Sequence, residues 1–226
     1  MPSLRQVRLY AKPPVFLLGL CPLAWLLAGA FGVGGVWLGA NPVKTIQHTT
    51  GLWGLRFLLL TLTMTPLRWI TGQAWPLQFR RMLGLYAFTY VGLHFLNYLL
   101  LDRALDLREI VEDIGKRPYI TIGFAALLCL VPLAVTSTAG WRRRLGQRWV
   151  ALHRLVYLIG ILGCWHFYWQ VKRDVREPLV YAGILALLLL YRVVRGRSAV
   201  RAPEASRAPV TPTSRAGLSM HPSESD

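Results

Sequence analysis

The chain has 226 residues, of which 54% are hydrophobic and only 16% charged, and its formal net charge is +16. The apolar residues come in long runs rather than along amphipathic faces. This composition argues against a soluble globular enzyme and predicts an integral membrane protein. The basic residues lie at the ends of the apolar runs, a pattern typical of contact with a lipid bilayer and not of nucleic acid binding.

Six apolar runs each approach the roughly 20 residues that a helix needs to cross a bilayer. The first has no clear cleavage site of small residues and is interpreted as a retained helix. We therefore predict an all-α, multi-pass bundle of six transmembrane helices over residues 15–195, a short segment at 1–14 and a disordered tail at 196–226. The runs are Val15–Leu38, Gly51–Ile70, Met82–Leu101, Tyr119–Thr136, Trp149–Trp169 and Leu179–Val194.

The distribution of charge predicts the orientation. The N-terminal segment, the second and fourth connections and the tail, together with the span ends next to them, carry 16 Lys and Arg residues, whereas the other three connections carry 8. Seven of the ten acidic residues belong to the second group. Because basic loops stay on the cytoplasmic side, both termini are expected in the cytoplasm.

Three histidines, His94, His153 and His166, fall inside predicted spans. An ionisable side chain in a span is costly and marks a functional site by default, although a structural histidine bonded to a neighbouring helix is the alternative. His94 and His166 lie about 10 Å and about 6 Å below the outer end of their spans, so they could hold one planar ligand between them. His153 lies about 20 Å deeper than His166.

Two imidazoles from facing helices in an aromatic-rich bundle suggest the axial ligands of a haem iron, an arrangement suited to electron transfer. A zinc site would need four ligands, typically with Cys or acids, and the predicted spans contain no acid. His153 and His166 stand about 140° apart on an ideal helix. Either this helix bends, near Gly160 and Gly163, or the two rings face different neighbours, so a second haem at His153 stays open.

Four stretches carry a resemblance to a known family. They are TLTMTPLRW (61–69), RRMLGLYAFTYVGLH (80–94), KRPYITIG (116–123) and RRLGQRWVALHRLVYLIGILGCWHFYW (143–169). Together they resemble MsrQ (YedZ), a family of haem-binding membrane subunits of protein-methionine-sulfoxide reductase systems within the ferric-reductase-like transmembrane group. The resemblance covers about residues 10–195.

This resemblance implies b-type haem, an FMN and a place in the bacterial inner membrane. It implies that electrons are drawn from membrane quinones and passed to a periplasmic molybdopterin partner, MsrP, which repairs methionine sulfoxide in proteins. The chain would then be an electron-transfer subunit and not the catalytic one. His94 and His166 match the outer haem ligands and His153 one inner ligand. The other inner position holds Arg80, so a second haem would need a different ligand.

Two arginines within the spans are further candidates. Arg56, near the outer end of the second span, is expected to pair with a haem propionate or to reach the outer surface. Arg154, beside His153, is expected to pair with a propionate or a flavin phosphate, or to reach the inner surface. The role of His48, in the first outer connection, stays open.

Two other functions fit some of these features. A self-contained ferric or oxygen reductase of the same fold would carry nicotinamide and flavin domains, for which a 31-residue tail is too short. A proton-coupled transporter would use the histidines as relays, but such proteins usually show internal repeats, and we find none in the sequence.

Overall fold

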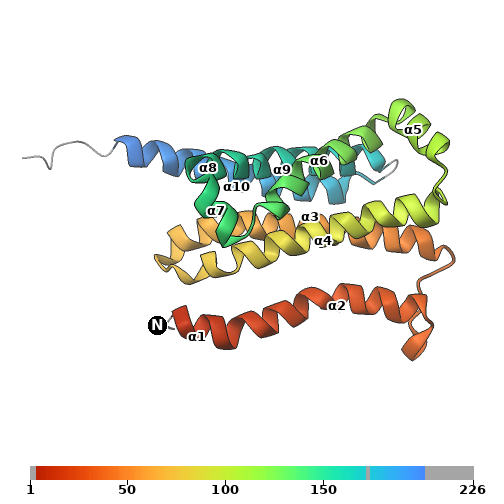
Figure 1. Ribbon diagram of the computed structural model, residues 1–226, viewed down its shortest axis with the longest axis horizontal. Helices are drawn as coiled ribbons and strands as arrows, with labels where there is room; N and C mark the ends of the chain where they lie inside the picture. The colour runs from red at the N-terminus through yellow and green to blue at the C-terminus, as the bar shows by residue number, and fades with distance from the viewer. Residues whose placement is uncertain (1–3, 172–173, 202–226) are drawn as a thin grey trace, which may run out of the picture.

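The computed structural model describes residues 4–171 and 174–201, and every regular element in these residues is a helix (Figure 1). The described ranges contain ten α-helices, and four short 3-10 or π-helical segments separate the first five of them. The α-helices are α1 (Leu4–Gln6), α2 (Lys12–Ala30), α3 (Pro42–Thr71), α4 (Arg80–Asn97), α5 (Leu107–Lys116), α6 (Pro118–Val135), α7 (Ala139–Leu145), α8 (Gln147–His153), α9 (Leu155–Gln170) and α10 (Arg176–Arg201).

Five helical stretches are long and apolar enough to cross a membrane. They are Leu9–Ala30, Arg80–Asp102, Pro118–Val135, Gln147–Gln170 and Arg176–Arg195. The second predicted span, Gly51–Ile70, lies within α3, which is 30 residues long but is not among the five. The all-α prediction is therefore confirmed. Five candidate spans are found where six were predicted, and α3 is the predicted span that is not among them.

Helix α3 occupies the centre of the bundle, in contact with α2, α4, α9 and α10. It carries Arg56 and Arg68 and several threonines, and its buried residues include Leu58 and Leu62. The hydroxyl of Thr61 donates to the carbonyl of Phe57, 2.8 Å away, so this polar group is satisfied inside its own helix. A helix surrounded by other helices needs less hydrophobic surface than one that faces lipid.

Some predicted boundaries differ from the observed ones. The first helix ends at Ala30 and not at Leu38, because Gly32 and Gly34 adopt left-handed backbone angles with φ of 66°. Helix α10 continues to Arg201, past the predicted end at residue 195. The rest of the predicted tail, 202–226, lies outside the described residues. A helix in the third connection, α5, was not predicted.

Two helix pairs make the most extensive contacts, α3 with α4 and α6 with α9. Tyr90, which is fully buried, attaches α2 to this core: its hydroxyl donates to the carbonyl of Gly19 (2.8 Å) and accepts from the amide of Leu23 (3.1 Å). Helices α1, α7 and α8 and the last turns of α10 lie at one end of the bundle, and α5 lies at the other (Figure 1). The latter is called the α5 end below.

The span that contains His153 and His166 is interrupted between them. Helix α8 ends at His153 and α9 begins at Leu155, with Arg154 at the junction. The amide of Arg154 bonds the carbonyl of Ala151, which is a tighter turn than that of an α-helix. The structure therefore has one tighter turn between the two histidines, at Arg154, and α9 runs without interruption through Gly160 and Gly163.

Candidate histidine-lined site

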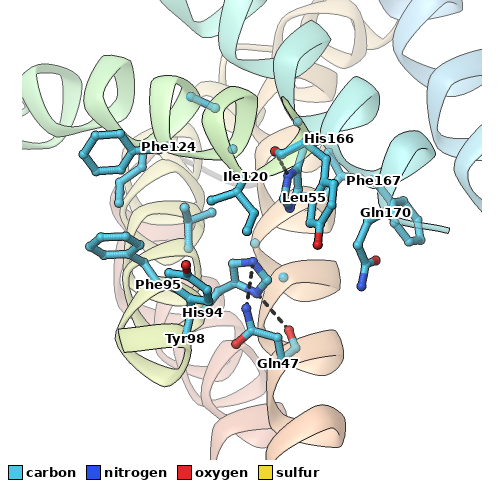
Figure 2. A pocket seen from close by; sticks show the side chains of 18 of the residues that line it. Gln47, Leu55, His94, Phe95, Tyr98, Ile120, Phe124, His166, Phe167 and Gln170 are labelled. Carbon is cyan, nitrogen blue, oxygen red and sulfur yellow. Dashed lines mark hydrogen bonds between the residues drawn. The ribbon is translucent and has the colours of Figure 1, made fainter. Parts of the chain in front are cut away.

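A cavity of ≈390 Å³ lies between the two helix pairs, toward the α5 end. This volume falls within the range of about 300–1,000 Å³ that is typical of small-molecule sites. Its walls are largely apolar and aromatic, with a few polar groups among them. Leu55, Phe95, Ile120, Phe124 and Phe167 form much of the apolar wall (Figure 2).

His94 of α4 and His166 of α9 both line this cavity, as their predicted depths require. Their ring centres are 6.0 Å apart, and the two ring planes are nearly perpendicular, at 86°. Figure 2 shows the two side chains entering the cavity from opposite helix pairs. The structure thus brings together the two histidines that the sequence pairs.

The same local arrangement holds both rings. Nδ1 of His94 donates to the carbonyl of Gln47 on α3 at 2.8 Å, and Nδ1 of His166 donates to the carbonyl of Tyr119 on α6 at 2.7 Å. Because a carbonyl oxygen only accepts, each Nδ1 carries the proton and each Nε2 keeps a free electron pair for a metal. This tautomer is the one that metal-binding histidines use when Nε2 is the ligand.

A glycine makes room for each ring, four residues after the carbonyl that holds it. A Cβ atom on Gly51 would lie 2.8 Å from Nδ1 of His94, and one on Gly123 would lie 2.7 Å from Nδ1 of His166. Real Cβ atoms essentially never approach other heavy atoms this closely. Neither glycine was predicted to belong to the site, although Gly123 ends the KRPYITIG stretch.

The two rings differ at Nε2. Nε2 of His94 accepts from the side-chain amide of Gln47 at 3.3 Å, and Oε1 of the same amide accepts from Asn97 at 2.5 Å. For Nε2 of His166, the described residues provide no hydrogen-bond partner. Gln47 was missed in the sequence because nothing near it marks a polar contact to a helix 47 residues away.

These residues fit a metal held between two imidazoles. Bonds of about 2 Å from each nitrogen to the metal, plus the ring radii, account for a centre-to-centre separation of this size. The aromatic and aliphatic walls suit a flat, apolar macrocycle, and two histidines are a common axial pair for haem. The site therefore fits a haem, with His94 and His166 as the ligands.

His153 lies away from this cavity. Its ring stacks on Trp149 with the centres 3.8 Å apart, and its Nδ1 donates to the Trp149 carbonyl at 3.1 Å. It is the last residue of α8, 13 residues before His166 along the chain. Its neighbour Arg154 is exposed at the same junction.

Arg56 does not line the cavity. Its Nε donates to the hydroxyl of Tyr181 on α10 at 2.8 Å, and its guanidinium lies 4.9 Å from the ring centre of Trp53. These contacts hold the arginine against Tyr181 and Trp53 and away from the cavity wall. His48, by contrast, lies on α3 and lines the cavity near Phe167, with the ring centres 6.2 Å apart.

Two cavity-lining arginines, Arg103 and Arg117, were missed because they belong to the third connection. Nothing in the sequence showed that this connection folds over the site. Burial alone would lower the pKa of Arg103, but the nearby carboxylates of Asp113 and Asp102 more than offset it, so the pKa lies above its ordinary value. Arg103 is therefore always charged.

Comparison with known proteins places the chain in a family. The model of the ferric reductase like transmembrane component matches residues 50–164. A relative from Xanthomonas euvesicatoria pv. vesicatoria is 53% identical over 207 residues, which cover 89% of this chain and 95% of the relative. A second, from Rhodospirillum rubrum, is 54% identical over 196 residues, which cover 86% and 91%. Both are named protein-methionine-sulfoxide reductase heme-binding subunit MsrQ.

The chain belongs to the MsrQ family. The resemblance seen in the four sequence stretches is thereby confirmed over about nine tenths of the chain. The match to the ferric-reductase-like component covers α3 from Thr50, all of α4 to α8 and α9 as far as Cys164; it includes His94 and ends two residues before His166. No solved structure matches this chain.

Proposed function

We propose that this chain is the haem b-binding membrane subunit of a methionine sulfoxide reductase system, with His94 and His166 as the axial ligands of the iron. The observation that carries the proposal is the pair of imidazoles facing one cavity, each with Nδ1 bonded to a backbone carbonyl. This bond fixes the ring orientation and makes Nε2 a better ligand. The names of the MsrQ relatives support the same assignment.

The bound haem would supply one-electron chemistry. The protein's own residues would hold it in a dry, aromatic cavity and occupy both axial positions, which leaves no open position for oxygen or substrate. Such a site favours electron transfer over catalysis at the iron. We therefore propose an electron-transfer subunit rather than the catalytic one, and we extend from the family resemblance that it also uses FMN.

We further propose that α3 is a sixth membrane crossing, with both termini in the cytoplasm of a bacterial inner membrane. At about 1.5 Å per residue, the 30 residues of α3 exceed the thickness of the hydrocarbon core. The cavity would then lie near the periplasmic side. Electrons would enter from membrane quinones and leave to the periplasmic molybdopterin subunit MsrP.

The test is a dithionite-reduced minus oxidised optical spectrum of the detergent-purified chain, with haem quantified per protein. Sharp b-type α and Soret bands are expected, with at least one haem per chain. A ratio of two would assign a further haem to the region of His153, the remaining histidine within the predicted spans. A folded, haem-supplied preparation without these bands would contradict the proposal and favour a histidine-bearing transporter.

A further inference from the structure

Two arginines reach the cavity from the segments that close its α5 end. Arg103 follows the π-helical turn Tyr98–Asp102 at the end of α4, and Arg117 immediately precedes α6. Both line the same cavity as His94 and His166. They lie at the end where α5 packs over α6, and thus where the bundle meets the membrane surface in the proposed topology.

One buried carboxylate holds both guanidinium groups. Nη2 of Arg103 lies 2.6 Å from Oδ2 of Asp113, and Nε of Arg117 lies 3.1 Å from Oδ1 of the same residue. The hydroxyl of Tyr98 donates to Oδ2 at 3.1 Å, and the side chain of Asp113 is only 11% exposed. Asp113 therefore fixes both arginines in place without neutralising both.

The other carboxylates near Arg103 are weaker partners. Asp102 and Glu109 lie 3.7 Å and 3.4 Å from its guanidinium, and both side chains are more than half exposed, so water screens their charge. Nε of Arg103 is buried and has no hydrogen-bond partner among the described residues; its nearest carboxylate oxygen, Oδ2 of the cavity-lining Asp102, is 3.7 Å away, too far for a hydrogen bond. A buried donor without a partner is costly, and one beside a cavity is available to a ligand.

A guanidinium group is well matched to a carboxylate, which it binds through parallel hydrogen bonds. The rest of the cavity wall is mostly apolar, so a ligand with a flat apolar body and carboxylate substituents would bind in one orientation. Its carboxylates would lie toward the α5 end, because burying them at the apolar end would leave them unpaired. Haem has this combination of groups.

We infer that Arg103 and Arg117 form a carboxylate clamp that binds the propionates of the haem, with Asp113 as the residue that positions both guanidiniums. This inference rests on the proposed function. Arg103 and Arg117 would then pair with the propionates, a role that the sequence suggested for Arg56. The guanidinium of Arg56 instead contacts Tyr181 and Trp53.

The test uses the full chain, purified without haem and titrated with protohaem or with its dimethyl ester, in which both carboxylates are blocked. The variants are Arg117→Gln, Arg117→Lys and Arg103→Lys. Arg108→Gln is the matched control, because Arg108 is an exposed arginine of the same connection that does not line the cavity. The readouts are the bis-imidazole spectrum and the rate at which haem passes to excess apomyoglobin.

Wild type is expected to release protohaem about tenfold more slowly than the ester. One charge-assisted hydrogen bond to a carboxylate is enough to produce a difference of about this size. Arg117→Gln should lose most of this preference, Arg117→Lys should recover part of it, and Arg108→Gln should behave as wild type. If Arg103→Lys does not fold, because Asp113 loses its closest partner, the two Arg117 variants decide the question.

The experiment distinguishes a failure of the arginine clamp from a failure of the proposed function. If wild type binds both compounds with a bis-imidazole spectrum but shows no preference, or if Arg117→Gln keeps the full preference, the clamp is wrong and the histidine pair stands. If neither compound gives a bis-imidazole spectrum in wild type, the proposed function itself is wrong, and the clamp is rejected with it.

Discussion

His94 and His166 sit on different helix pairs, yet the two pairs hold them in the same way. In each pair, a helical carbonyl accepts from Nδ1, and a glycine four residues later leaves room for the ring. The α3–α4 pair supplies Gln47 and Gly51, and the α6–α9 pair supplies Tyr119 and Gly123. The arrangement fixes the tautomer with backbone atoms alone and requires no acid in the membrane.

The two helix pairs differ in how they hold Nε2 of the histidine, the nitrogen that would bind the metal. Gln47 holds His94 at both ring nitrogens, through its carbonyl and its side-chain amide, whereas His166 is held only at Nδ1. A ligand to the metal must offer a free Nε2, so the amide of Gln47 has to move before His94 can bind iron. The comparison indicates that His166 is ready to bind a metal and that His94 is ready only after a small rearrangement.

The largest expected effect comes from removing either ring. His94→Ala or His166→Ala should abolish the haem of the cavity, because a single imidazole cannot provide the axial pair. Haem content and the reduced spectrum of the purified variants measure this loss. His153→Ala is the matched control: it removes an imidazole outside the cavity and should leave the cavity haem intact. Full haem retention in either of the first two variants would show that the pairing is wrong.

The sequence predicted the histidine pair and the helices more reliably than the closure of the site. Long apolar runs report lipid exposure directly, so most spans were visible in the composition. The central helix α3 carries Arg56, Arg68 and several threonines among its apolar residues, and it is not among the five candidate spans. The depth of His94 and His166 followed from counting residues along helices, which needs no tertiary information.

The groups around the histidines could not be predicted in the same way. Gln47, Gly51 and Gly123 matter through contacts across helices, and no local pattern encodes these contacts. Arg103 lies in a connection between two apolar runs that the distribution of charge placed on the outer side, and only the fold shows that this connection closes over the cavity. The depth of Arg56 left it facing either a haem propionate or the outer surface, and its direction around the helix turns it toward Tyr181.

An intermediate effect is expected from the two glycines. Gly51→Ala and Gly123→Ala each place a methyl group against a histidine ring and should weaken haem binding about tenfold, the lower end of the range for groups that support metal ligands. The two effects should be about equal, because each added Cβ would lie at nearly the same distance from Nδ1 of its ring, 2.8 Å and 2.7 Å, and because Gln47 no longer holds Nε2 of His94 once that nitrogen binds the metal. Haem release rates measure both. A large difference between the two variants would contradict the shared arrangement.

The control for these variants is Gly92→Ala on α4, where an added Cβ meets no atom within 4 Å. Alanine is preferred to glycine inside helices by about 0.5–1 kcal/mol. This variant should therefore be as stable as wild type or slightly more so, with unchanged haem release. An equal loss of haem in Gly92→Ala would mean that the other two substitutions act through the helices and not through the rings.

The smallest effect is expected from Gln47→Leu. This substitution removes the side-chain amide of Gln47 but keeps its backbone carbonyl, which holds Nδ1 of His94. The loss of the hydrogen bond to Asn97 should lower the free energy of unfolding by about 1 kcal/mol. Haem should still bind, and its association with the haem-free protein should be a few-fold faster, because no amide then occupies Nε2 of His94. Stopped-flow haem binding measures this rate. Slower association would mean that the amide prepares His94 for the metal instead of blocking it, and the two histidines would then be equally ready.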